Sequence, residues 1–134
     1  MSQFPLQLKQ YFFTQIECNA NPEYRPEGTV NIDSKFVAAP SEDGPGVFTA
    51  ELSMWVNEET SENPPYFIKI SGFCVLQAAP DVSPEMANQL AVTSGAQVLV
   101  GAIREEIARL TARGPWGTFM LPLIPVSPPV PQQP

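Results

Sequence analysis

The stretch Ser83–Gly114 reads SPEMANQLAVTSGAQVLVGAIREEIARLTARG, and its apolar residues recur at steps of three and four. This spacing predicts an amphipathic helix. The opening Ser-Pro-Glu is a typical helix start, because a serine hydroxyl caps the first turn and proline fits its first position. A Gly-Pro pair at 114–115 ends the pattern. It remains open whether Ser94-Gly95 divides the segment into a short helix and a long one.

Four segments ahead of this helix alternate apolar and polar residues, which predicts β-strands. They lie at residues 6–18, 30–36, 48–56 and 66–76, and turn-forming residues separate them. Four successive strands joined by turns indicate an antiparallel sheet with one face covered. In the first strand Gln10 and Thr14 interrupt the apolar series. The side chains expected to face the core there are Leu6, Leu8, Phe12, Ile16 and Cys18.

The length and charge of the chain limit its function. Its 134 residues suit one domain, and 14 acidic residues against 7 basic ones give a net charge of −7. This balance argues against binding to nucleic acid or to an anionic membrane surface, because both need clustered cations. The chain has no histidine, which excludes Ser-His-Asp hydrolases. We therefore expect neither an enzyme nor a bound metal or cofactor.

The compartment follows from two further features of the sequence. The first ten residues, MSQFPLQLKQ, lack a signal peptide, and no stretch approaches the ~20 apolar residues of a membrane span. We expect a cytoplasmic protein that does not insert into membranes. Cys18 and Cys74 are then expected to be reduced thiols of the core.

The aromatic residues indicate a binding surface. Residues 11–13 are Tyr-Phe-Phe, so both faces of the first strand carry an aromatic side chain. Exposed apolar patches of this kind mark interfaces or binding grooves. The alternative is a break in register that turns some of these side chains into the core. Strand parity places five apolar residues on the face away from the core: Phe13, Trp55, Phe67, Phe73 and Val75.

The helix carries a motif that resembles the SecB family of protein-export chaperones. The step REEI at 104–107 is followed by RG at 113–114 and then by Trp116, as in that family. Residues 86–90 resemble the family's helix opening, and LPLIPV at 121–126 resembles its final extended segment. The strands resemble the family by pattern only.

The resemblance implies a single domain over residues 1–126, followed by a proline-rich tail at residues 127–134. The implied fold is α+β, with a four-stranded antiparallel sheet of order 1-4-3-2 and helices packed on one face. Members of the family hold unfolded preproteins in apolar grooves and keep them competent for export without ATP hydrolysis. Their dimers pair through helices into tetramers.

The resemblance also implies site residues and partners. Unfolded polypeptides are the expected clients, and the SecA motor is a further expected partner. The expected polypeptide-binding residues are Phe13, Tyr24, Phe36, Trp55, Trp116 and Phe119. The expected oligomer interface is a stripe on the helix, formed by Leu99, Ile103, Ile107 and Leu110.

The sequence departs from the family at two places. The tail SPPVPQQP (residues 127–134) cannot form the family's second helix, since proline breaks helices. Gln15, Asn19 and Lys69 stand where the family has acidic residues that contact SecA. Two alternatives therefore stay open: a SecB-like adaptor oligomer, and a solitary chaperone with one dedicated client such as an antitoxin.

Overall fold

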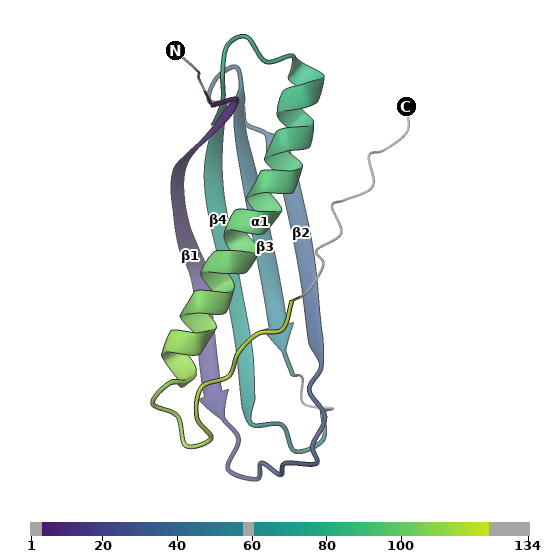
Figure 1. The fold of residues 1–134 in the computed structure, drawn as a ribbon, viewed down its shortest axis with the longest axis vertical. Coiled ribbons are helices and arrows are strands. Elements are labelled where there is room, and N and C mark those ends of the chain that lie inside the picture. The colour runs from purple at the N-terminus through teal and green to yellow at the C-terminus, as the bar shows by residue number, and fades with distance from the viewer. Residues whose placement is uncertain (1–3, 58–60, 124–134) are drawn as a thin grey trace.

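The computed structural model describes residues 4–57 and 61–123. Its elements, in chain order, are β1 (Leu6–Ala20), β2 (Ile32–Pro40), β3 (Val47–Val56), β4 (Tyr66–Ala78) and α1 (Pro84–Thr111). The strands form one antiparallel sheet of order β1-β4-β3-β2, and α1 runs obliquely across one face of it (Figure 1). The predicted α+β fold and strand order are confirmed. The predicted boundary between domain and tail, at residues 126 and 127, lies outside the described residues.

Helix α1 begins as its sequence predicts. The Ser83 hydroxyl accepts a hydrogen bond from the Met86 N–H at 3.2 Å. The helix continues through Ser94-Gly95, so the division into two helices is wrong. Gly95 instead allows a close approach to the sheet, because a Cβ atom there would lie 3.0 Å from the Cβ of Ala50 on β3.

The core lies between α1 and the inner face of the sheet, the face that α1 covers. The strands β3 and β4 supply every second side chain to it, as their alternating burial shows. Burial of one such side chain contributes about 1.5–3 kcal/mol. The largest completely buried apolar side chains come from β3, β4 and α1: Leu52, Met54, Val56, Ile70, Leu76, Leu99, Ile103 and Ile107.

Strand β1 differs from its predicted pattern. Register shifts between Leu8 and Gln10 and between Phe13 and Gln15 each insert one extra residue opposite β4. Between these bulges the parity is reversed, since each bulge turns the following residues to the other face. Phe13 therefore faces inward, opposite Gly72, and Phe12 faces outward, opposite Phe73. The predicted directions of both side chains were wrong, and the break in register was the correct alternative for Phe13.

The outer face of the sheet has no covering element in the part of the chain that the structure describes (Figure 1). The predicted outward direction holds for Trp55, Phe67, Phe73 and Val75, which alternate with buried residues of β3 and β4 and are half-buried. The polar side chains of Ser53 and Ser71 interrupt this face and hydrogen-bond to each other at 2.9 Å. The outer face is thus a mixed surface rather than a continuous apolar one.

The chain after α1 turns back and crosses the inner face beside the helix (Figure 1). Leu121, near its end, is 3% exposed and belongs to the core. We call residues Thr118–Leu123 the strap. Among residues 4–57 and 61–123, no helix is long and apolar enough to cross a membrane.

Candidate polypeptide-binding surface

Strand β1 exposes large apolar side chains because it is an edge strand and α1 covers little of it. Within residues 4–57 and 61–123, its one neighbour in the sheet is β4. Edge strands with exposed apolar residues are ready templates for pairing with another chain. Four large apolar side chains of β1 are between 40% and 52% exposed: Leu8, Tyr11, Phe12 and Ile16.

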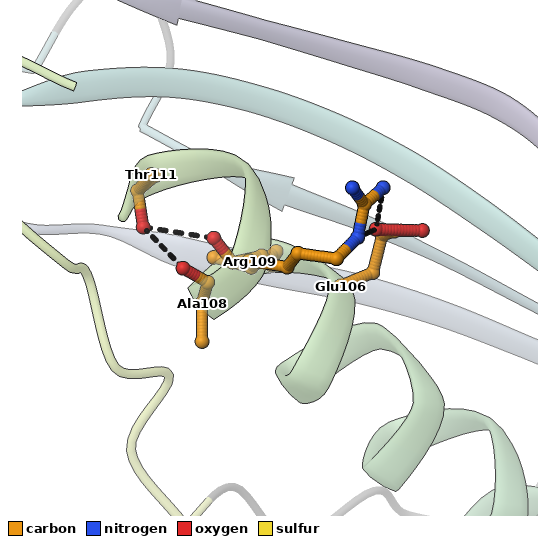
Figure 2. Close-up of polar contacts among 5 residues, drawn as sticks. Glu106, Ala108, Arg109 and Thr111 are labelled. Carbon is orange, nitrogen blue, oxygen red and sulfur yellow. Dashed lines mark hydrogen bonds and ion pairs between the residues drawn. The ribbon is translucent and has the colours of Figure 1, made fainter. Parts of the chain in front are cut away.

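A groove of about 200 Å³ lies between β1 and the C-terminal half of α1. Tyr11 and Phe13 form its β1 side, and the helix contributes Ala102, Glu105 and the pair Glu106–Arg109. The Arg109 Nε donates to Glu106 Oε1 at 2.6 Å, as Figure 2 shows. The groove therefore combines an aromatic wall with a carboxylate-rich helix edge.

Near this groove, the end of α1 carries a threonine that bonds back to the helix. The Thr111 hydroxyl donates back to the Ile107 carbonyl at 2.8 Å and lies near the Ala108 carbonyl (Figure 2). These contacts add a side-chain donor at two carbonyls near the end of α1.

A second hollow of about 590 Å³ lies on the outer face of the sheet. Trp55 and Phe67 form its apolar part, and Glu17, Asn19 and Lys69 its polar part. The Lys69 Nζ lies 5.9 Å from the centre of the Trp55 ring, within the range of a cation–π contact. Glu17 is paired with Lys69 across β1 and β4.

The predicted binding residues do not share one groove. Tyr24 and Trp116 meet at one end of the molecule, with ring centres 5.2 Å apart, and the Trp116 Nε1 donates to the Asn21 carbonyl at 2.8 Å. Phe13 lies in the groove beside α1, whereas Trp55 lies on the opposite face of the sheet.

The other two predicted binding residues lie at the core. Phe36 is 8% exposed, because β2 turns this side chain inward below Gly95. It is therefore not part of an open surface, which corrects its predicted place. Phe119, in the strap, is half-buried against the core cluster. A binding role for Phe13, Tyr24, Trp55, Trp116 and Phe119 stays a prediction.

The helix stripe predicted as an oligomer interface lies mostly within the protomer. Leu99, Ile103 and Ile107 have no exposed surface, because they pack on the sheet of their own chain. These three side chains therefore do not lie on a surface that another subunit reaches. Leu110 is half-buried and stays a prediction as a contact residue.

The two cysteines are free thiols. Burial raises the pKa of the Cys74 thiol to about 11, against a smaller opposing effect of a backbone hydrogen bond with Ala50. Burial also raises the pKa of Cys18. Both shifts favour the neutral thiol, which is a poor nucleophile.

The residues that the sequence prediction missed are Leu8, Tyr11 and Ile16 on β1. Gln10 and Thr14 break the apolar alternation close to the two bulges, but these polar residues alone do not show which register β1 takes against β4. The alternation fixes which residues share a face only while no extra residue is inserted. The exposure of these side chains depends on the oblique course of α1, which no local pattern encodes.

No family model matches this chain, and no curated protein sequence matches it. A similar solved structure is that of the Mycobacterium tuberculosis Rv1957 SecB-like chaperone in complex with a ChAD peptide from the Rv1956 HigA1 antitoxin. The match has a TM-score of 0.64 at 16% identity, over 92% of this chain and 93% of that one.

A protein of unknown function from Streptococcus agalactiae is also similar in structure. Its TM-score is 0.53 at 15% identity, over 91% of this chain and 100% of that chain. Likeness at this level of identity concerns the fold. The predicted resemblance is confirmed in that sense: this chain has the fold of the SecB-like chaperones.

Proposed function

We propose that this protein is a chaperone that holds unfolded polypeptides on exposed apolar surfaces without ATP hydrolysis. The observation that carries the proposal is the set of exposed apolar side chains along β1 next to the groove beside α1. Unfolded chains expose apolar side chains that folded proteins bury. Burial of apolar surface is non-directional, so such a surface accepts many sequences.

The charge of the protein supports the same role. The net charge of −7 keeps molecules with exposed apolar patches apart, which favours solubility. Glu105 and Glu106 lie at the rim of the groove and attract basic segments of a client. The Arg109 side chain pairs with Glu106 and leaves the exposed Glu105 as the more available carboxylate.

Assembly into an oligomer is part of the proposal, and β1 is the element that favours it. Phe12 and Ile16 are exposed along an edge strand, and a second copy would cover them by pairing edge to edge, while Leu8 and Tyr11 would stay open to clients. A further pairing of such dimers through the exposed face of α1 would give the predicted tetramer. Leu110 and its exposed neighbour Arg109 lie on or next to that face.

The clients are proposed to be unfolded preproteins held in the cytoplasm before export. SecA is the least supported partner, because the polar residues Gln15, Asn19 and Lys69 lie on the outer face where the family has acidic contacts. The second candidate is a chaperone with one dedicated client. The Mycobacterium tuberculosis SecB-like chaperone favours this candidate, because its structure contains a peptide from an antitoxin.

The proposal is tested by aggregation of a chemically denatured model protein after dilution. We expect the chain to slow light scattering near stoichiometric concentration without nucleotide. Tyr11→Gln combined with Leu8→Gln should weaken this effect, whereas Met86→Gln should not, since Met86 is 50% exposed but lies at the start of α1. A lack of any effect at tenfold excess would refute the holding role.

The two candidates differ in the partners that the protein would capture. A general holdase retains many unfolded chains, whereas a dedicated chaperone or adaptor retains one partner at fixed stoichiometry. Native purification from the source cells, followed by mass spectrometry of what is bound, separates these outcomes.

A further inference from the structure

The strap has the features of a bound extended peptide. It forms neither helix nor strand, and over residues 118–122 exposed side chains alternate with the half-buried Phe119 and the buried Leu121. Leu121 is 3% exposed and Phe119 is packed against the core, whereas Met120 and Leu123 are 63% and 90% exposed. Only the two inward side chains contribute apolar burial.

The polar contacts of the strap involve its main chain. The Phe119 N–H donates to the Thr111 hydroxyl oxygen at 2.8 Å. The Arg104 guanidinium donates from Nε to the Leu121 carbonyl at 3.2 Å and from Nη2 to the Pro122 carbonyl at 3.4 Å. Contacts to main-chain groups do not depend on the identity of the strap's side chains.

Hydrogen bonds also hold the chain directly before the strap. The Tyr66 hydroxyl donates to the Gly117 carbonyl at 2.7 Å and accepts from the Trp116 N–H at 3.2 Å. Beyond Gly117 the described contacts come from Thr111, Arg104 and the inward side chains alone. The turn after α1 is thus held by contacts that do not involve the strap.

We propose that the strap occupies a binding site for clients on its own protomer, and that an extended segment of a foreign chain can bind the same track in place of the strap. The track is the line along the inner face that the strap covers, with Thr111 and Arg104 at its polar edge. Its ligand is an extended peptide with apolar side chains at alternate positions, of any sequence otherwise. This inference rests on the proposed holding function. It adds that the chain's own strap competes with clients for the track.

The test uses the full chain and a fluorescent peptide, GTFMLPL, which copies residues 117–123. Leu121→Asp should release the strap and leave the track open. Leu123→Asp is the matched control, because it adds the same charge at a side chain that is 90% exposed. We expect the peptide to bind Leu121→Asp about tenfold more tightly than the wild type or Leu123→Asp, since the open fraction sets the apparent affinity.

A second pair of variants tests the role of Arg104. Adding Arg104→Ala to Leu121→Asp should reverse the gain in peptide affinity. Adding Arg113→Ala, which removes the same charge from an exposed position at the end of the helix, should leave it unchanged. A peptide with glutamine in place of the inward Phe and Leu should not bind, whereas one with glutamine in place of the outward Met and final Leu should.

Equal affinity for wild type, Leu121→Asp and Leu123→Asp would overturn the inference, as would no binding to a folded Leu121→Asp protein. If Leu121→Asp loses its cooperative thermal unfolding, Leu121→Ala and Leu123→Ala replace the pair. The aggregation assay separates the two proposals. Slowed aggregation without peptide binding refutes the strap's role alone, whereas peptide binding without slowed aggregation refutes the holding function and limits the track to the chain's own strap.

Discussion

The Tyr66 hydroxyl joins β4 to the chain after α1 through the Trp116 N–H and the Gly117 carbonyl. Gly114 lies directly beside it. A Cβ atom on Gly114 would stand 2.3 Å from the Tyr66 hydroxyl oxygen, well inside van der Waals contact. The glycine at this position is therefore required for close packing, in addition to ending the helix.

Two glycine substitutions with opposite expected effects test this point. Gly114→Ala should lower the free energy of unfolding by about 2–3 kcal/mol, because the tyrosine must move and its hydrogen bonds weaken. Gly101→Ala should raise it by about 0.5–1 kcal/mol, since a Cβ there meets nothing within 4 Å and alanine favours the helix. Urea denaturation of both variants measures these changes, and equal effects would contradict the packing.

The thiols give a prediction that depends on pH. With a pKa of about 11, about one Cys74 thiol in a thousand is ionised at pH 8, so alkylation there should be very slow. Cys18 is half-buried and should react first with iodoacetamide. Mass spectrometry locates the label, and unfolding in urea should make both thiols reactive. Rapid labelling of Cys74 in the folded protein would contradict its burial.

The same shift affects stability at high pH. The folded Cys74 keeps its proton up to about pH 11, whereas the unfolded thiol has an ordinary pKa of 9.0. Because the folded state binds more protons between these values, stability should fall as the pH rises from about 9 to 11. Below pH 9 the Cys74 thiol should have no effect on how the free energy of unfolding changes with pH.

At the scale of elements, the pairing of β1 with β4 includes an aromatic contact on the outer face. Phe12 and Phe73 are directly opposite, with ring centres 5.4 Å apart. A double-mutant cycle of Phe12→Ala and Phe73→Ala should give a coupling energy of about 0.5–1.5 kcal/mol. Val37→Ala, on β2 of the same face, should add to Phe12→Ala without coupling. If the changes in the free energy of unfolding also simply add for Phe12→Ala and Phe73→Ala, the contact between the two rings does not stabilise the pairing of β1 with β4.

The elements also show which features sequence alone determines. The helix was predictable because its cap, periodicity and stop are local signals within residues 83–115. The faces of β1 were not, because its bulges arise from pairing with β4, whose residues are remote in sequence. The extended course of residues 121–123 was expected from the family resemblance, but the contacts that hold the strap to Arg104 and Thr111 were not, since no periodicity reveals them. The strand order came from the family resemblance.

For the candidate site, the sequence predicted the kind of surface better than its location. Outward aromatic residues were expected and occur at Trp55, Phe67 and Phe73. Phe36 was misplaced because α1 covers β2 at Gly95, and the course of a helix over a sheet is a property of the whole molecule.

At the scale of the whole molecule, a substitution at the fully buried Ile103 distinguishes a defect in folding from a defect in assembly. Ile103→Glu would bury a carboxylate without a partner in the protomer's own core. The cost, on the order of several kcal/mol, should unfold the protomer rather than only dissociate the oligomer. Circular dichroism would detect this as a loss of cooperative thermal unfolding. A folded variant of lower mass would instead restore the helix stripe as a subunit interface.

The edge of β1 should control assembly without controlling the fold. Ile16 is 43% exposed, so Ile16→Lys can extend its ammonium group into water while the sheet stays intact. The added charge would be buried if a second β1 paired with this edge, so the mass measured by light scattering should fall. Val30→Lys, at a side chain 46% exposed just before β2, is the matched control and should keep the wild-type mass. A wild-type mass near the 14.7 kDa of one chain, or an unchanged mass for Ile16→Lys, would exclude β1 as the assembly edge and leave its apolar side chains available to clients alone.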